Sequence, residues 1–128
     1  MNLQTFHQTF ETYLSSNYSL TDIEFENVPY TPTKGRPFID PTIVNTKSLS
    51  IMSGDGSKTR YEGKLRFYVY TPLRSGSRES YIIADTLIDL LERNRIAPDL
   101  TTRQAQIYPA NPVGEFHRLV VEIPYILN

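Results

Sequence analysis

The sequence predicts an α+β fold, a mainly antiparallel sheet packed against two helices, in helix-strands-helix-strands order. Three observations support this prediction. Two segments, near residues 3–15 and 78–93, repeat apolar residues at helical spacing. The segments between and after them alternate apolar and polar residues, as half-buried strands do. The length of 128 residues suits one domain, residues 1–128.

The first half of the chain is expected to start with a helix and continue into strands. Asn17 is expected to end the helix in a left-handed conformation. A short strand follows around Ile23 and Phe25. Residues 38–44 form a strand candidate in which Pro41 indicates an edge or a bulge. Further strand segments are expected at residues 46–52 and 60–70, joined by a long hairpin tip at residues 53–59.

The clearest strand is residues 60–70, where Leu65, Phe67 and Val69 share the face expected to meet the core. Ser77 is expected to cap the second helix. Ile83 is placed at the margin of its core stripe. Strands are expected at residues 102–108 and 116–126, with a hairpin connection at 109–114. The residues of the second helix that are predicted to face the core are Tyr81, Ala84, Leu87, Ile88 and Leu91.

Composition argues against several functional classes. The net charge is −1, whereas proteins that bind nucleic acid through phosphates carry a basic excess. The absence of cysteine excludes disulfides and thiolate metal sites. No apolar run is long enough to span a membrane. The two histidines, His7 and His117, lack partners that would make a catalytic or metal site, and no phosphate-binding loop occurs. We therefore expect no enzyme activity, no metal and no cofactor.

The first of several motifs that resemble a known family is a proline-rich segment at residues 25–37, FENVPYTPTKGRP. Its prolines restrict the backbone, so a stiff extended strap that displays Tyr30 is expected. Further along are YEG at 61–63, YTP at 70–72, a turn at Gly76, a helix with Ala84 and Asp85, and VEIPY at 121–125. In this order the motifs resemble the phage tail terminator-like family, which includes tail completion and minor tail proteins of long-tailed phages.

The resemblance implies a structural virion protein. Such a protein forms a ring, a hexamer in the family, that caps the tail tube, stops its polymerisation and offers a docking surface for the head connector. The implied partners are further copies of this chain, the tail tube protein and the head connector protein. DNA would pass through the ring without specific binding. The implied location is the head-proximal end of the virion tail, after assembly in the cytoplasm of the bacterial host.

Candidate contact residues follow from the charge pattern. An acidic stripe on the second helix includes Asp85 and Asp89, with Ile82 on the same polar side. Either this stripe is a solvated face or it meets cations of a neighbouring subunit. The candidate subunit-interface residues are Tyr30, Arg60, Arg74, Arg78, Ile82, Asp85 and Asp89. Residues Gly54, Asp55, Gly56 and Lys58 are expected to form a flexible loop that faces the lumen or a partner ring, or has no role.

Two alternatives to a tail terminator stay open. The chain could be another connector or head-completion ring protein of the same virion. It could also be a nucleic-acid module or an unrecognised enzyme. A short positive strip favours nucleic acid, although the overall charge does not. The strip consists of Lys58, Arg60, Lys64 and Arg66.

Overall fold

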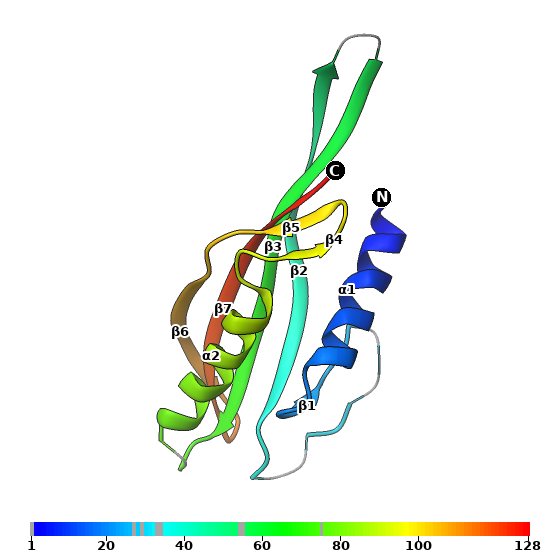
Figure 1. The fold of residues 1–128 in the computed structure, drawn as a ribbon. Coiled ribbons are helices and arrows are strands. Elements are labelled where there is room, and N and C mark those ends of the chain that lie inside the picture. Colours follow the sequence, from blue (N-terminus) through cyan, green and yellow to red (C-terminus); the bar gives the residue numbers. More distant parts are fainter. Residues whose placement is uncertain (1, 27, 29, 33–34, 54–55, 75) are drawn as a thin grey trace.

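The computed structural model describes every residue except 1, 27, 29, 33–34, 54–55 and 75, and gives only the backbone at residues 51–53 and 56–58. It has two helices and a mostly antiparallel sheet, which confirms the predicted α+β class (Figure 1). The elements are α1 (Leu3–Asn17), β1 (Asp22–Ile23), β2 (Phe38–Ser53), β3 (Gly56–Pro72), α2 (Arg78–Leu91), β4 (Arg95–Ala97), β5 (Leu100–Thr102), β6 (Gln106–Val113) and β7 (Phe116–Leu127).

The described strands form one sheet of seven in the order β1-β2-β3-β7-β5-β4, with β6 also paired to β7. The short β1 runs parallel to β2, and the other pairs are antiparallel. β7 pairs with β3 along one edge, while β6 and β5 share its other edge. β7 therefore joins the first and second halves of the chain.

The two helices pack against one face of the sheet, which we call the core face. Alternating residues of β3 are buried, as the pattern predicts, whereas β7 also buries the intervening Val120 and Glu122. The ring of Phe10 on α1 lies 5.9 Å from that of Phe67, and the ring of Phe6 lies 4.7 Å from that of Tyr125. α1 and α2 meet where the Tyr13 hydroxyl donates to the Leu90 carbonyl. Core residues include Phe6, Phe10, Leu14, Leu65, Phe67, Val69, Ile83, Leu87, Leu91, Leu119, Val121 and Ile123.

The core stripe of α2 starts one residue earlier than predicted. Tyr81, expected inside, is 50% exposed, whereas Ile83, expected at the margin, is 2% exposed. The buried positions step from Ser80 through Ile83 and Ala84 to Leu87, so a small residue begins the stripe. Ser80 Oγ donates to the Ser77 carbonyl, which satisfies its hydroxyl inside the protein. A tyrosine at the neighbouring position keeps its hydroxyl available to water.

The helix ends also differ from prediction. Asn17 stays helical, and the residue after it, Tyr18, is extended, so the predicted left-handed stop is wrong. The Asn17 side chain donates to the Tyr13 carbonyl, one turn earlier in the helix. Ser77 makes no side-chain capping bond to α2. After α2, Arg93 adopts the left-handed conformation, with φ of 48°.

The hairpin between β2 and β3 is longer than predicted because both strands continue into the expected tip. β2 is one strand from residue 38 to 53, and Ser53 pairs with Gly56. Gly56 and Lys58 thus belong to β3 and not to a loop, while Gly54 and Asp55 lie outside the described residues. Pro41 lies on the edge, as expected, because β1 pairs with β2 only at Phe38 and Ile39.

The chain between α2 and β7 was also divided incorrectly. The sequence predicts one strand at residues 102–108, whereas two short strands, β4 and β5, precede β6. β6 includes Pro109 and Pro112, which had indicated a connection. β6 pairs only with β7, so a proline nitrogen can face its open edge without removing a bond of the sheet.

Among the described residues, no third strand pairs with the far end of the β2–β3 hairpin. β3 pairs with β7 from Pro72 only as far as Tyr61, which lies opposite Leu127. We call the part beyond this point, residues 48–53 and 56–60, the arm. It projects past the rest of the sheet (Figure 1). A two-stranded ribbon is only marginally stable in water without further packing.

The base of the arm is fixed by Tyr125 of the last strand. The pairing of β2 and β3 shifts between Val44 and Lys47, and Asn45 in this bulge has φ of 55°. Tyr125 pairs with Gly63, and its hydroxyl lies 2.7 Å from Thr46 Oγ1. A Cβ on Gly63 would stand 2.8 Å from both the Tyr125 hydroxyl and the Val44 carbonyl oxygen. Glycine is therefore required at position 63, where the Tyr125 side chain passes over β3 to reach Thr46.

The change Gly63→Ala is expected to lower the free energy of unfolding by about 2 kcal/mol, because the Val44 carbonyl belongs to the backbone and has little room to move. Urea denaturation measures the loss. The control Tyr125→Phe removes only the hydroxyl contact with Thr46 and should cost about 1 kcal/mol. An alanine variant as stable as the wild type would contradict this account of the arm base.

Candidate functional site

The candidate site is a set of surfaces, because the described residues contain no group of three or more His, Cys, Asp or Glu side chains that could hold a metal. His117 Nε2 lies 3.1 Å from the Leu73 carbonyl oxygen, in the turn after β3. In the described part of the chain, neither helix has the length and apolar character needed to cross a membrane.

The open face of the sheet, opposite the core face, contains a buried ion pair. Glu122 is 4% exposed, and its Oε2 accepts from Arg66 Nε at 2.9 Å, with Arg66 Nη2 at 2.8 Å. Burial raises the pKa of Glu122, but hydrogen bonds from Tyr108 and Arg66 outweigh burial and hold that pKa below its usual value. Glu122 therefore stays ionised beneath its neighbours.

Aromatic side chains cover one end of the open face. The rings of Phe38 and Tyr70 are stacked at 4.4 Å, and Phe116 meets Phe38 edge-on at 5.3 Å. The Arg118 guanidinium lies 5.1 Å from the centre of the Tyr68 ring, at cation–π distance. None of these side chains belongs to the hydrophobic core cluster. They cover apolar surface on the open face by packing against one another.

Tyr30, the predicted interface residue of the strap, also has partners within its own subunit. Its ring lies 5.1 Å from that of Phe38, and its hydroxyl donates to Asp22 Oδ2 at 3.3 Å. Asp22 also pairs with Arg36 at 3.6 Å. Tyr30 thus holds part of the strap against the start of β2. A role for it between subunits stays a prediction.

Three acidic residues gather where β1 meets β2. Burial, followed by the charges of Glu24 and Glu26, raises the pKa of Asp40 to about 6, although a hydrogen bond with Thr42 acts in the opposite direction. Asp40 lies opposite Tyr68 in the sheet, on the open face. Its ionised form is therefore destabilised in the folded subunit.

The outer side of α2 presents the predicted acidic residues to solvent. Asp85 and Asp89 are exposed, and Ile82 is 47% exposed, so the sequence placed these three on the correct side. Glu92, the residue just after α2, accepts the Ala105 backbone N–H at 2.8 Å and so connects the helix end to the segment before β6. A contact between these three residues and a neighbouring subunit stays a prediction.

The predicted cations differ in their surroundings. Arg60 pairs with Glu62 at 3.7 Å and donates to Asn128 Oδ1 at 3.1 Å. Arg74 and Arg78 are exposed. The side chain of Lys58 lies outside the described part. Of the positive strip considered for nucleic acid, Arg60 and Arg66 therefore both have carboxylate partners within the subunit.

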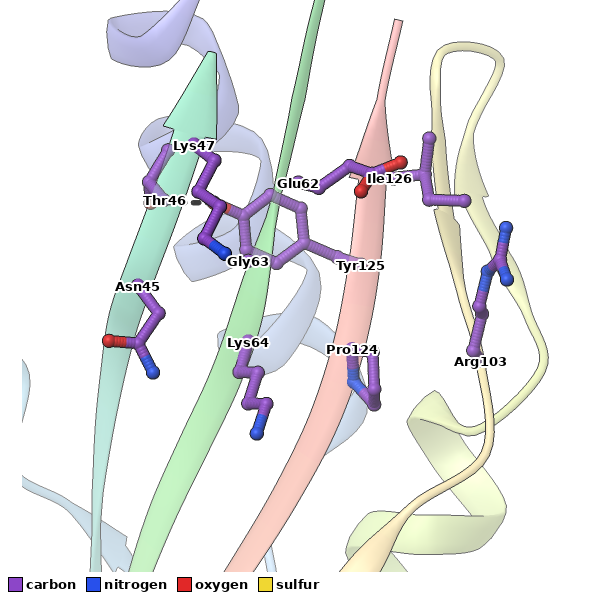
Figure 2. A pocket seen from close by; sticks show the side chains of 10 residues that line it. All are labelled: Asn45, Thr46, Lys47, Glu62, Gly63, Lys64, Arg103, Pro124, Tyr125 and Ile126. Atoms are coloured by element: carbon purple, nitrogen blue, oxygen red, sulfur yellow. Dashed lines mark hydrogen bonds between the residues drawn. The ribbon is translucent and has the colours of Figure 1, made fainter. Parts of the chain in front are cut away.

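A hollow of about 690 Å³ lies at the arm base (Figure 2). We call it the basic hollow because Lys47, Lys64 and Arg103 line it from separate segments, with Glu62 as the single acidic residue of its lining. Sequence reasoning missed it, because the segments come together only when β3 pairs with β2 on one side and with β7 on the other. Its remaining lining residues are Asn45, Thr46, Gly63, Pro124, Tyr125 and Ile126.

Replacing Arg66 by Met should lower the free energy of unfolding by about 3 kcal/mol, since Glu122 would remain buried without its cation. The double change Arg66→Met with Glu122→Leu should recover most of that loss. Denaturant titrations of both variants provide the measurement. Arg60→Met is the matched control, because its ion pair is exposed and contributes less than about 1 kcal/mol. A double variant no better than Arg66→Met would rule out a penalty from unpaired Glu122.

Stability should depend on pH through Asp40. The folded state binds its proton more tightly than the unfolded state, so stability from this group falls as pH rises from about 4 to about 6. Asp40→Asn should therefore raise the melting temperature near pH 7.5, and the gain should disappear near pH 4. Asp85→Asn, at an exposed position, is the control for removing one charge. A gain independent of pH would contradict the assignment.

Comparisons with known proteins were made against sequences and structures. A family model described as phage tail terminator protein matches residues 5–125. A solved structure matches with a TM-score of 0.69 and 18% sequence identity, over 100% of this chain and 96% of that chain, and this likeness shows the fold alone. No curated protein sequence matches significantly. Since the family model spans nearly the whole chain, the protein belongs to the phage tail terminator family and is a structural component of a phage tail.

Proposed function

We propose that this protein closes into a ring on the end of the phage tail tube, stops the tube from growing and provides the surface on which the head connector docks. Membership of the tail terminator family across residues 5–125 is the observation that carries the proposal. A ring of six subunits is what the resemblance to the family implies. No bond is made or broken, since the ring acts by occupying the surface that the next tube subunits would use.

The arm supports a role in association. It has no third strand within its own subunit, and a two-stranded ribbon gains stability when it docks on another surface. Leu49 on the arm is 41% exposed. A neighbouring subunit or the tube protein would cover such a side chain and order the ribbon. The segment predicted as a long flexible loop that contacts a partner is therefore replaced in the proposal by the arm, whose two strands pair with each other.

The outer side of α2 supports contact between subunits. Ile82 and Tyr81 are exposed side by side, and exposed apolar residues next to acidic ones suit the edge of an interface. A ring needs heterologous contacts, in which two different surfaces of each subunit meet. α2 supplies one such surface, and the other is considered in the next subsection.

The alternative, another connector or head-completion ring of the same virion, shares the ring but not the tube partner. The two functions differ in which polymer the ring recognises. A terminator binds the end of the tube, whereas a connector binds the head and leaves tube growth unchanged.

The test adds purified protein to polymerising tail tube subunits and measures tube lengths by electron microscopy. The expected result is arrested growth with a ring at one tube end. The matched control is Ile82→Asp, which should fold normally because the position is exposed, but should arrest growth less because it weakens the subunit contact. Tubes that grow equally long with and without the protein would exclude the terminator role, and binding to the head connector alone would favour the alternative.

A further inference from the structure

We propose that the basic hollow of one subunit receives the acidic side of α2 from the next copy of this chain, with Lys47 and Arg103 facing Asp85 and Asp89 across the interface. This inference rests on the proposed ring and names the two surfaces that would close it. It differs from the sequence-based expectation, in which Lys58, Arg60, Arg74 and Arg78 were the candidate cations.

The basic hollow has unused positive charge. No ion pair within 4.0 Å joins Lys47, Lys64 or Arg103 to an acidic group among the described residues. Lys47 and Arg103 are exposed, whereas Lys64 is half-buried. The backbone N–H of Arg103 donates to the Pro124 carbonyl, so the chain that bears this arginine is fixed to β7. A carboxylate placed between these side chains would be attracted by cations from separate segments of the chain.

The hollow also has an apolar part. Pro124 and Ile126 of β7 line it and remain partly exposed. In Figure 2, Lys64 and Arg103 lie on either side of Pro124, and Lys47 lies farther away, beside Thr46 on β2. A partner that combines carboxylates with an apolar side chain would therefore fit better than a small anion, because it would cover the proline and isoleucine as well.

The outer side of α2 has this combination. Asp85 and Asp89 lie one helical turn apart, about 6 Å along the axis, and both are exposed. Neither takes part in an ion pair among the described residues. Ile82 lies one turn before Asp85 and is 47% exposed. One helix side thus offers two carboxylates and an aliphatic group.

The positions of the two surfaces suit a head-to-tail contact. The buried side of α2 joins the core face of the sheet, so its outer side points away from the sheet. Lys64 alternates with the core residue Leu65, which places it on the open face. The two surfaces therefore lie on opposite sides of the subunit. Copies joined through them repeat in one direction and form a closed ring when the rotation closes.

The competing occupant is nucleic acid, because the same cations could bind phosphates. A protein partner is favoured for two reasons. Arg60 and Arg66 beside the hollow are already paired with carboxylates, which leaves few cations along a path that a phosphate backbone would follow. The chain as a whole carries a charge of −1.

The experiment reverses each surface and then combines the two variants. The first variant is Lys47→Glu with Arg103→Glu, which leaves Lys64 in place near Glu122. The second is Asp85→Lys with Asp89→Lys. Both variants should fold and lose the ring, with a small drop in melting temperature for the first variant because position 47 lies opposite Glu62. An equimolar mixture should form rings again, because each variant then meets a complementary surface. Sedimentation and electron microscopy, with tail tubes present, measure ring formation.

The matched control is Arg74→Glu with Arg78→Glu, at exposed positions near the start of α2. It should form rings like the wild type. If this variant loses the ring and is rescued by the helix variant, the basic partner of α2 is misassigned and the inference fails. Loss of salt-dependent binding to double-stranded DNA in the first variant, with rings intact, would assign the hollow to nucleic acid and overturn the inference.

The remaining outcomes separate this inference from the proposed function. Wild-type protein that forms no ring, even beside its tubes, contradicts both. Wild-type rings that persist in both reversed variants contradict only the contact between the basic hollow and α2. Lost rings that the mixture does not restore also contradict the contact, because the two surfaces would then have other partners.

Discussion

The structure depends on one constraint, which is that helices contribute to the core on one face of the sheet only. The core face buries alternate residues of β3 and β7 with those of α1 and α2. In the described part of the chain, no helix covers the open face, so side chains of the sheet itself shield most of it. The stacked rings of Phe38 and Tyr70 do this at one end, and the Arg66–Glu122 ion pair does it near the centre. The arrangement explains how a glutamate on an open face is buried and still ionised.

The same constraint gives β7 its central role. This strand is last in the sequence, yet it holds β3 on one side and β5 and β6 on the other. Through Tyr125 it also reaches across Gly63 to the bulge of β2. The arm is therefore anchored by the end of the chain, although it is made near the middle. Such distant contacts require loop closure before they become favourable.

The sequence was sufficient where local pattern and burial agree. Leu65, Phe67 and Val69 alternate with charged and aromatic residues, and the core side of β3 followed from that alternation. The sequence was misleading where strand pairing extends through residues whose types are typical of loops. Glycine and serine near Gly56 are typical of a loop, but cross-strand partners extend the hairpin through them. Pro109 is typical of a connection, but β6 tolerates it on an edge.

The candidate site was predictable to the extent that it lies on one element. Asp85, Asp89 and Ile82 share one side of one helix, so helical spacing alone placed them on the surface. The basic hollow was not predictable, because Lys47 reaches Lys64 through the pairing of β2 with β3, and Arg103 joins them only after β3 and β7 pair.

Arg66 and the cations of the basic hollow lie on the same open face but differ in their partners. A cation directly opposite Glu122 is used within the subunit, whereas the three cations that line the basic hollow have no acidic group within ion-pair distance among the described residues. The first kind of charge stabilises the subunit, and the second kind is the one that the proposed ring contact uses.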